Sequence, residues 1–482
     1  MIERTAGRTA NIGLFAVVHD TYYAQFDGLQ ATLEDYHQTL KEQLAGYEIN
    51  LIDYGFANGQ PAAAAIAARM RRDQLDLIFC NMATYATSAT FAPIILGTTQ
   101  PVVLLALQPR AAMDYSRAST VMQLENDNIC SVPEFTGVAI RLGRPVADVV
   151  IGTLVDDPAA AQEIQSWCDI ACVLHALKDA RIGLMGHVME AMYDMHTDPT
   201  AISAAFGVHV AQLEIDDLVR EFDHADPLAI EQKLQLILAE FDRPDPRTDP
   251  LTETLTDEDL HQAAVGAAAL DALVERHDLT GLAYYYEGRP DSPQQRVISS
   301  LIAGNTMLNA RGIPMCGEFD LKTCLAMLIM DRLNIGGSFA EFHPFDFIED
   351  FILVGHDGPH HMAIAEDRPI LRSLKKFHGK PGHGASVEFK IKEGPITMLG
   401  LTQTATGAFK FVIGEGISRK GPIPPTGNTN TRAFFAPNTR AFVKAWVMEG
   451  PTHHYALGVG HHAETLRKIA DILGIESVIV KA

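Results

Sequence analysis

The sequence has few cysteines, and their spacing excludes the common small metal and disulfide sites. Six cysteines occur among 482 residues, and none stands in the paired spacing of a zinc ribbon. Cys168 and Cys172 lie one helical turn apart, and we interpret them as buried side chains on one face of a helix. This cysteine usage favours a reduced, cytoplasmic protein.

Long hydrophobic runs are also missing. A helix that spans a membrane needs roughly 18 or more consecutive apolar residues, and no stretch of the sequence approaches that length. The apolar run at residues 12–18 is short and no cleavage site of small residues follows it. We therefore interpret it as a strand rather than a signal peptide, and we expect a soluble protein without a membrane partner.

Basic residues are scarce relative to acidic ones. Lysine and arginine total 38 against 60 aspartates and glutamates, which gives a formal net charge of -22. Such a charge repels nucleic acid and anionic membrane surfaces. No Gly-x-Gly-x-x-Gly or Walker-type loop follows any expected strand, which disfavours a nucleotide ligand. An uncharged small molecule remains compatible with all of these absences.

The composition and pattern that are present indicate a folded α/β protein. Hydrophobic residues make up 47% and charged residues 20% of the chain, and its length suggests about three domains. Short apolar strand candidates alternate with helical patterns in the first third, which predicts a parallel sheet with helices on both faces. These strand candidates are residues 12–18, 49–54, 75–79 and 102–105. An amphipathic helix between the first two carries Phe26, Leu29, Leu33, Tyr36, Leu40 and Leu44 at steps of three and four.

The alternation of strand and helix restarts near residue 158 and changes near residue 335. Expected elements of the second α/β unit are helices at 158–178 and 227–240 and strands at 181–185, 208–213 and 282–286. Residues 242–259 are rich in Pro, Asp and Thr and are predicted to form a surface loop. After residue 335, alternating apolar positions predict antiparallel strands, with a long loop at 421–430 and a last helix and strand at 463–473 and 477–480. We therefore expect two Rossmann-like α/β domains, at 1–178 and 179–334, and a mostly antiparallel, β-barrel-like domain at 335–482.

Histidines crowd the last third of the chain, in segments that also carry carboxylates. The candidate segments contain Glu318 with Asp320, Glu341 with His343, His356 with Asp357, and His453 with His454. No compact ligand pair is present, so any metal ligands must converge from distant segments. From spacing alone, surface histidines with structural carboxylates remain an open alternative. A mixed carboxylate and imidazole site would suit Mn²⁺, Co²⁺, Mg²⁺ or Zn²⁺.

Four motifs together resemble the L-arabinose isomerase family. They are Gly-Glu318-Phe-Asp-Leu-Lys-Thr, Gly-Ser-Phe-Ala-Glu341, Gly-His356 and Gly-Pro-Thr-His453-His454. The resemblance is strongest from about residue 310 to the end and can be followed back to the first strand. It implies that Glu318, Glu341, His356 and His454 bind a divalent metal ion. It also implies that the two glutamates are the catalytic acid–base pair.

The resemblance also implies a fold, a cofactor and a reaction. The expected fold is two Rossmann-like domains and a C-terminal β-barrel domain, and the expected assembly is a homo-oligomer built on trimers, such as a hexamer. The expected ion is Mn²⁺, with Co²⁺ or Mg²⁺ as alternatives. The reaction would interconvert an aldose and a ketose, moving a proton between adjacent carbons through an enediol, which needs a carboxylate base, a second proton carrier and a polarising cation.

Two segments depart from the family and predict a different sugar. The family's Gln-His-Leu-Tyr segment is replaced by a stretch containing His19, and its His-Gly-Gly-Arg-Glu-Phe segment by one containing Glu134. Since groups that bind hydroxyls discriminate between sugars, we expect altered sugar specificity. The residues expected to contact the substrate are His19, Glu134, His343 and His453. Asp320 and Lys322 are expected to hold the loop around Glu318, and at least one of Tyr284 and Tyr286 is expected to pack in the core.

Two other functions stay open. One is another metal-dependent reaction on a sugar or sugar acid, such as that of an epimerase, a dehydratase or a lyase, on the same scaffold. The other is a non-catalytic sugar-binding protein, because tandem α/β units also build binding proteins. A complete set of four ligands with an acid–base pair favours an enzyme.

Overall fold

The computed structural model describes residues 2–189, 191–249, 252–358, 360–374 and 382–481. The chain forms two compact units, residues 8–176 and residues 1–7 together with 177–482. Among the residues described, no helix has both the length and the hydrophobicity needed to cross a lipid bilayer.

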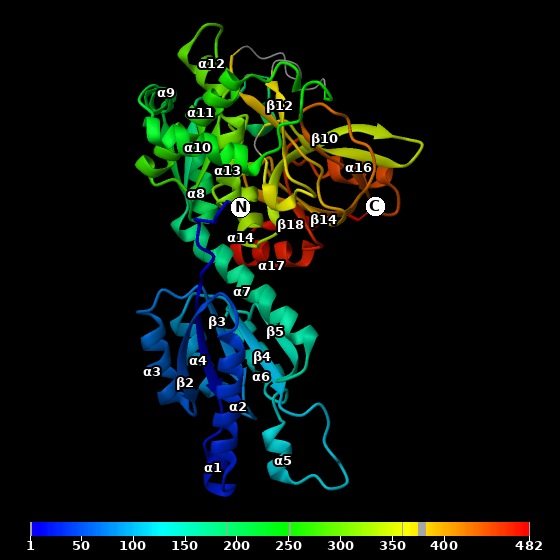
Figure 1. Cartoon of the computed structure of the whole chain (residues 1–482). Helices are drawn as coiled ribbons and strands as arrows, with labels where there is room; N and C mark the ends of the chain where they lie inside the picture. Colours follow the sequence, from blue (N-terminus) through cyan, green and yellow to red (C-terminus); the bar gives the residue numbers. More distant parts are fainter. Residues whose placement is uncertain (1, 190, 250–251, 359, 375–381, 482) are drawn as a thin grey trace. The chain divides into compact units, whose positions relative to one another are not determined.

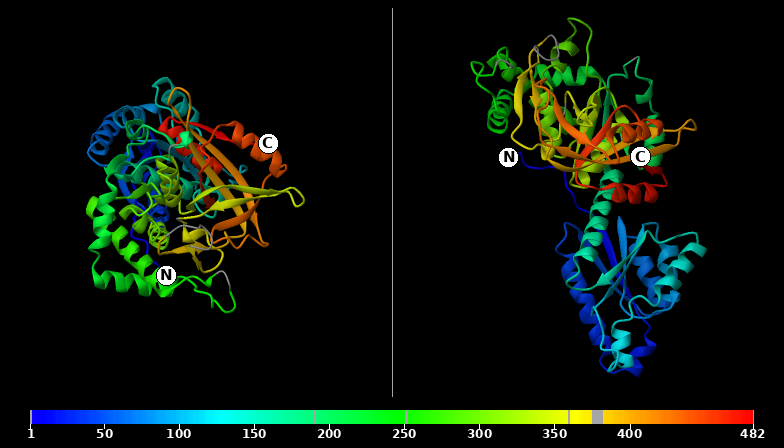
Figure 2. Two further views of the ribbon diagram at one scale, coloured as in Figure 1. Left: turned by 90° about the horizontal axis from the view of Figure 1, so that it is seen from above. Right: turned by 90° about the vertical axis from the view of Figure 1, so that its right-hand side faces the viewer.

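The first unit is built on a parallel five-stranded sheet in the order β2-β1-β3-β4-β5, with helices on both faces (Figure 2). Its strands are β1 (Asn11–Val17), β2 (Asn50–Ala57), β3 (Leu77–Met82), β4 (Val102–Gln108) and β5 (Asp148–Thr153). Its main helices are α2 (Leu29–Leu44), α3 (Gln60–Met70) and α6 (Val132–Arg141), and α7 (Pro158–Asp179) begins in it. The predicted alternation of strands and helices is confirmed.

The first amphipathic helix begins later than its apolar stripe suggested. Phe26 lies outside α2, because Gly28 has a left-handed φ of 84° and separates α2 from the short α1 (Thr21–Gln25). The predicted stripe positions Leu29, Leu33, Leu40 and Leu44 are buried. Cys168 and Cys172 are also buried and unpaired, as the sequence predicted.

The second unit starts with a smaller parallel sheet in the order β7-β6-β8-β9. Its strands are β6 (Arg181–Met185), β7 (His209–Leu213), β8 (Gly281–Tyr284) and β9 (Met315–Cys316). The longer helices in this part are α9 (Ile215–Asp223), α10 (Pro227–Glu240), α11 (Asp257–His277), α13 (Ile302–Ala310) and α14 (Leu321–Arg332) (Figure 1). A second α/β element is therefore present, as expected.

The predicted loop at 242–259 ends earlier than expected. Helix α11 begins at Asp257, because Thr256 caps it: the Thr256 hydroxyl accepts a hydrogen bond from Asp259 N, and the Asp259 side chain accepts one from Thr256 N. The sequence prediction missed this helix start because the segment before it is rich in Pro and Asp, which are typical of loops.

The second unit also contains a closed antiparallel barrel of six strands in the order β14-β17-β10-β11-β16-β15, which the pairing of β14 with β15 closes, and a separate antiparallel pair, β12 (Ile370–Ser373) with β13 (Ala385–Glu388). The barrel strands are β10 (Gly336–Asp346), β11 (Phe351–His356), β14 (Gly394–Gln403), β15 (Phe409–Arg419), β16 (Thr429–Phe434) and β17 (Tyr455–Val459). Strand β18 (Glu476–Ile479) follows α17 (Ala463–Leu473) and adds to β15 in parallel. The predicted fold class is confirmed, while the domain boundaries at 178 and 334 stay predictions.

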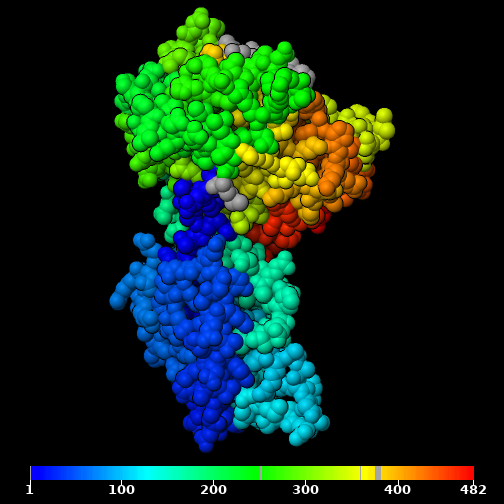
Figure 3. Space-filling model, in the orientation of Figure 1, coloured from blue at the N-terminus to red at the C-terminus, as the bar shows by residue number. Residues whose placement is uncertain are grey.

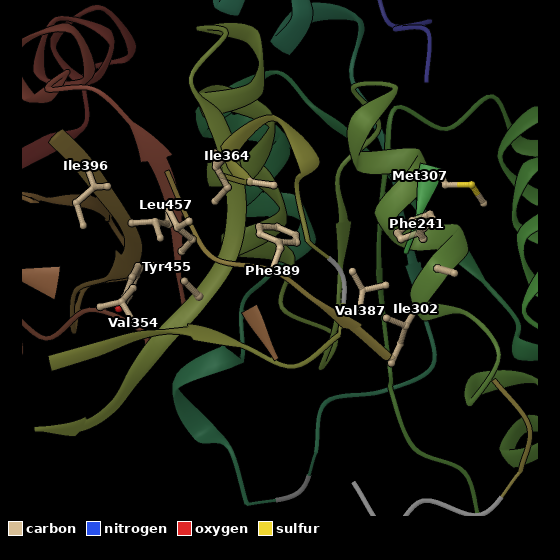
Figure 4. Packing of buried hydrophobic residues seen from close by; sticks show 14 of the residues in the cluster. Phe241, Ile302, Met307, Val354, Ile364, Val387, Phe389, Ile396, Tyr455 and Leu457 are labelled. Atoms are coloured by element: carbon tan, nitrogen blue, oxygen red, sulfur yellow. The ribbon is translucent and has the colours of Figure 1, made fainter. Parts of the chain in front are cut away.

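One hydrophobic core joins the barrel to the helices of the second unit. It includes Phe241 and Ile302 from the helical part and Val354, Ile396 and Leu457 from barrel strands (Figure 4). In the space-filling view, the helical part and the barrel strands form one continuous body, drawn green and yellow to orange (Figure 3). This core therefore includes buried side chains of the barrel strands β10, β11 and β17, which carry or adjoin three of the candidate site residues.

Candidate metal centre

Four separate elements of the second unit carry the predicted metal ligands to one place. Glu318 follows β9 at the carboxyl end of the parallel sheet, and Glu341 lies within β10. His356 is the last residue of β11, and His454 directly precedes β17. Strands β10 and β11 are paired, with Glu341 opposite Gly355. The barrel thus gathers three of the side chains, and the sheet edge presents the fourth to them.

The side chains face one another at distances that suit a shared ion. His356 Nε2 lies 3.8 Å from Glu318 Oε1 and 3.7 Å from Glu341 Oε1. His454 Nε2 lies 3.6 Å from Glu318 Oε2. Ligand atoms of Glu341, His356 and His454 all lie within 4.8 Å of one another, and so do those of a second group, Glu318, His453 and His454. Since metal–ligand distances are about 2.0–2.2 Å, atoms with these separations can surround one cation.

The hydrogen bonds of the two imidazoles point their free nitrogens at Glu318. His356 Nδ1 lies 2.5 Å from the Asp357 carbonyl oxygen and 3.2 Å from Asp357 Oδ1. His454 Nδ1 lies 3.1 Å from Asp320 Oδ2. A ring that donates through Nδ1 keeps the lone pair on Nε2 for a metal, which is the usual arrangement of ligating histidines.

Two buried atoms of the cluster lack hydrogen-bond partners among the described residues. They are Glu318 Oε2 and His454 Nε2, which face each other. Their separation of 3.6 Å is too long for a hydrogen bond. An unpaired buried polar atom is costly, and a cation between the two would remove that cost. The residues present therefore fit a divalent ion with oxygen and nitrogen ligands.

The backbone at Glu318 is held in an unusual conformation. Glu318 and Phe319 both have φ of 61°, in the left-handed region. Such a conformation costs about 1–3 kcal/mol for a residue with a Cβ and persists only where neighbours enforce it. Phe319 N donates to the Tyr284 carbonyl at 2.8 Å, which ties this turn to β8. The strained turn aims the Glu318 side chain at the barrel.

Three carboxylates surround the His356 imidazole. Burial acts to lower the pKa of His356, but Asp357, Glu341 and Glu318 together raise it to about 9. Burial lowers the pKa of His454 below its ordinary value, and the neighbouring positive charge of His356 adds to this effect. The carboxylates thus favour a positive charge at His356, where either a proton or a metal ion can provide it.

The sequence missed several residues that support the four. Phe339, almost fully buried on β10, packs with its ring centroid 4.4 Å from that of His356 and 4.3 Å from that of His454. Asp357 was visible beside His356, but only the folded ring orientation reveals its hydrogen bond. Asp194, from a distant loop, had no sequence signal at all.

Lys322 and Asp194 connect that distant loop to the centre. The buried Lys322 Nζ donates to the carbonyl oxygens of Asp194 and His196 at 3.0 and 3.1 Å. Asp194 Oδ2 in turn lies 2.6 Å from His453 Nδ1 and accepts from His453 N at 3.0 Å. His453 therefore stands in a fixed position next to His454, with ring centroids 3.9 Å apart.

The remaining predicted residues occupy different surroundings. His343 Nδ1 lies 3.9 Å from Glu341 Oε1, and burial lowers the pKa of His343. His19 and Glu134 belong to the first unit. There His19 packs edge-on against Tyr22, with ring centroids 5.3 Å apart, and Glu134 Oε1 accepts from Ser88 N at 2.8 Å.

Glu318 and His356 also line a pocket in the second unit. Its other walls include Tyr284, the last residue of β8, and Tyr286 just after it, together with apolar side chains of Ile298, Ile302 and Leu374. A ligand in this pocket would contact both the polar cluster and an apolar wall.

Comparisons with known proteins show that the chain is similar to sugar isomerases. Residues 355–481 match the family described as L-fucose isomerase, C-terminal domain. The L-arabinose isomerase of Nocardioides sp. is 27% identical over 410 residues, covering 82% of this chain and 79% of the relative. That of Aeromonas hydrophila is 22% identical over 458 residues (92% and 90%), and that of Bacillus subtilis 24% over 362 residues (72% and 69%).

A conserved domain protein from Vibrio cholerae is among the solved structures that match. It covers 64% of this chain and 88% of its own, with 11% identity and a TM-score of 0.17. This overlap is too slight to bear on the fold or the site.

Proposed function

The chain is a divergent member of the L-arabinose isomerase family, and we propose that it is a metal-dependent aldose–ketose isomerase with an altered sugar specificity. The observation that carries the proposal is the convergence of Glu318, Glu341, His356 and His454, with two buried ligand atoms facing each other unpaired. A protein that only binds a sugar needs no such acid–base pair.

In the proposed reaction, Glu318 and Glu341 share the proton transfers. One carboxylate removes the weakly acidic proton from the carbon beside the carbonyl, and the other exchanges protons with the hydroxyl and carbonyl oxygens. His356 and His454 hold their Nε2 atoms toward both carboxylates and, with them, would hold a divalent ion. A bound ion supplies positive charge that polarises the carbonyl bond of the sugar.

The sugar itself is expected to differ from L-arabinose. The proposal rests on the two replaced segments around His19 and Glu134, because hydroxyl-binding groups set the selectivity between sugars. Mn²⁺ as the preferred ion, a homo-oligomer built on trimers and a cytoplasmic location stay predictions drawn from the resemblance.

Metal content and thermal unfolding test the site directly. Wild-type protein should bind about one Mn²⁺ per chain, and an ion at 100 times its Kd should stabilise the fold by about 2.7 kcal/mol. The His356→Ala/His454→Ala variant should lose both effects, whereas His209→Ala, an exposed histidine of β7, should keep them. Absence of any response of the wild type to Mn²⁺, Co²⁺ or Mg²⁺ would remove the metal site.

The catalytic role is tested with Glu341→Gln and a panel of aldopentoses and aldohexoses assayed for ketose formation. Loss of a positioned acid–base group should reduce turnover about 10²–10⁴-fold, while the fold is retained. Turnover close to wild type in this variant would exclude Glu341 from the proton transfer. A wild type that binds Mn²⁺ but converts no sugar in the panel would favour another metal-dependent reaction on the same scaffold.

A further inference from the structure

Tyr284 lines the pocket beside the candidate metal centre. It is the last residue of β8, only 4% exposed, and it lines the same pocket as Glu318 and His356. Its backbone carbonyl accepts the hydrogen bond from Phe319 N that fixes the Glu318 turn. The tyrosine is therefore held rigidly next to the proposed catalytic carboxylate, and the proton transfers proposed above leave its hydroxyl group unused.

A buried asparagine fixes the direction of hydrogen bonding at this hydroxyl. Asn305, on α13 and fully buried, donates from Nδ2 to Tyr284 Oη at 2.6 Å. Because the phenolic oxygen accepts this bond, the phenolic proton takes no part in it. Burial raises the pKa of Tyr284 above the ordinary value of about 10, so the phenol keeps its proton at neutral pH and Tyr284 remains a hydrogen-bond donor.

The side chains that line the pocket determine what the phenolic proton of Tyr284 can bind. The pocket lining combines the apolar side chains of Ile298, Ile302 and Leu374 with the hydroxyl groups of Ser299 and Tyr286. A buried hydroxyl flanked by apolar side chains makes a selective hydrogen bond, because a ligand that lacks the partner atom leaves the hydroxyl unpaired at a cost in binding free energy.

We propose that Tyr284 donates a hydrogen bond to an oxygen of the bound sugar and so determines which sugars the pocket accepts, with Asn305 as its positioning residue. This inference rests on the proposed isomerase function and names a substrate contact within it. A sugar without the oxygen that accepts the Tyr284 hydrogen bond would leave the phenolic proton unpaired, so it would bind more weakly.

The neighbouring tyrosines provide an internal control. The Tyr285 hydroxyl lies 3.4 Å from Glu287 Oε2, an exposed side chain, and Tyr285 does not appear among the pocket-lining residues. Tyr285→Phe removes the same atom as Tyr284→Phe at the adjacent position. Any effect common to both variants therefore reports on the strand and its loop rather than on the proposed contact.

The first test is Tyr284→Phe on the sugar that the panel shows to be converted. KM should rise about 5- to 30-fold, the range expected for one hydrogen bond in a buried site, with kcat within about threefold of wild type. Tyr285→Phe should leave both constants unchanged. Among deoxy analogues of the same sugar, one should bind equally well to wild type and Tyr284→Phe, which identifies the oxygen. Equal KM values for wild type and Tyr284→Phe would overturn the proposal.

Asn305→Leu tests the positioning role through a double-mutant cycle. If Asn305 acts through Tyr284, Asn305→Leu weakens binding, and the double variant binds no more weakly than Tyr284→Phe alone. Additive losses would show that Asn305 has only a structural role. Thermal unfolding of each variant separates a loss of fold from a loss of binding.

Polyol binding separates failure of this inference from failure of the proposed function. Calorimetry with the Mn²⁺-loaded protein and xylitol, ribitol, L-arabinitol or galactitol needs no turnover. A wild type that converts no sugar but binds a polyol about 5- to 30-fold more tightly than Tyr284→Phe would overturn the isomerase and support the contact. Equal polyol affinities, or no polyol binding by the wild type, would overturn the contact.

Discussion

At the scale of single residues, Asp320 does the most to orient the candidate metal centre. It is fully buried, and its Oδ1 accepts from Thr323 N at 3.0 Å as the N-cap of α14. Its Oδ2 accepts from the Thr323 hydroxyl at 2.7 Å and holds His454 Nδ1 at 3.1 Å. Burial acts to raise the pKa of Asp320, but the hydrogen bond and charge of His454 hold it below its ordinary value. Both carboxylate oxygens of Asp320 therefore already accept hydrogen bonds.

Asp320→Asn should weaken metal binding without unfolding the chain. Whichever way the amide is turned, its NH₂ group meets a donor, either Thr323 N–H or the Thr323 hydroxyl and His454 together. Loss of a supporting hydrogen bond of this kind costs about 10–100-fold in metal affinity. Titration calorimetry with Mn²⁺ measures the change, and Asp216→Asn, at an exposed position of α9, is the control. Unchanged Mn²⁺ affinity in Asp320→Asn would show that His454 needs no fixed orientation.

Sequence motifs predicted the candidate ligands better than the residues around them. Glu318, Glu341, His356 and His454 stand in four recognisable runs, so their convergence could be expected from a resemblance. Asp194 stands in no such run and reaches His453 only because Lys322 holds the intervening loop. A contact that depends on the conformation of one loop produces no hydrophobic periodicity in the sequence, so it cannot be predicted from the pattern.

At the scale of elements, one short segment organises the whole site through alternate residues. Glu318 belongs to the cluster, Asp320 orients His454, and Lys322 fixes the loop that carries Asp194. Burying an ammonium group is costly, and burial lowers the pKa of Lys322 accordingly. Two backbone carbonyls offset that cost. The sequence pointed to a loop-holding role for Asp320 and Lys322, but not to the partners that each of them has.

The barrel contributes through a close contact between β11 and β16. A Cβ added at Gly355 would lie 1.7 Å from the Thr429 carbonyl oxygen, so only glycine allows the strand pairing that places His356. Gly355→Ala should destabilise the fold by about 1–3 kcal/mol or more through overpacking, and should also weaken Mn²⁺ binding. Gly137→Ala, in α6 with open space around it, should be neutral or stabilising by up to about 1 kcal/mol. Denaturant unfolding of both variants tests the contrast, and equal stabilities would contradict it.

At the scale of the whole molecule, periodicity predicted the architecture because the strands of the parallel sheets and those of the barrel differ in their hydrophobic pattern. Continuous apolar runs predicted the parallel strands, and the alternation of apolar and polar residues after residue 335 predicted the antiparallel strands of the barrel. The pairing of β14 with β15 is a hairpin between strands that are neighbours in the chain. Two other pairings could not be predicted: β14 pairs with β17, and β18 joins β15 in parallel after a helix. Local hydrophobicity shows neither of them, since register and partner are set by the assembled sheet.

The N-terminal segment is anchored to the second unit by a buried carboxylate, and this makes stability depend on pH. Asp331, at the end of α14, accepts from Arg4 at 2.8 and 2.5 Å and lies 3.1 Å from His361 Nε2. Burial acts to raise the pKa of Asp331, but the bonds from Arg4 and His361 bring it well below its ordinary value. In the unfolded chain this carboxyl group titrates near about 3.9.

Because the folded pKa of Asp331 is the lower one, the unfolded state takes up its proton first as pH falls. The stabilisation by Asp331 is therefore fully present above about pH 4–5 and is lost as pH falls toward the folded pKa. Asp331→Asn leaves Arg4 and His361 facing a neutral amide, so it should cost about 3–5 kcal/mol at pH 7. The difference from wild type should shrink as pH falls below about 4, since the wild type alone loses this contribution. Denaturant unfolding from pH 7 to pH 3 measures both curves, with Asp216→Asn as control, and a difference that stays constant across this range would show that the carboxylate is not held by these partners.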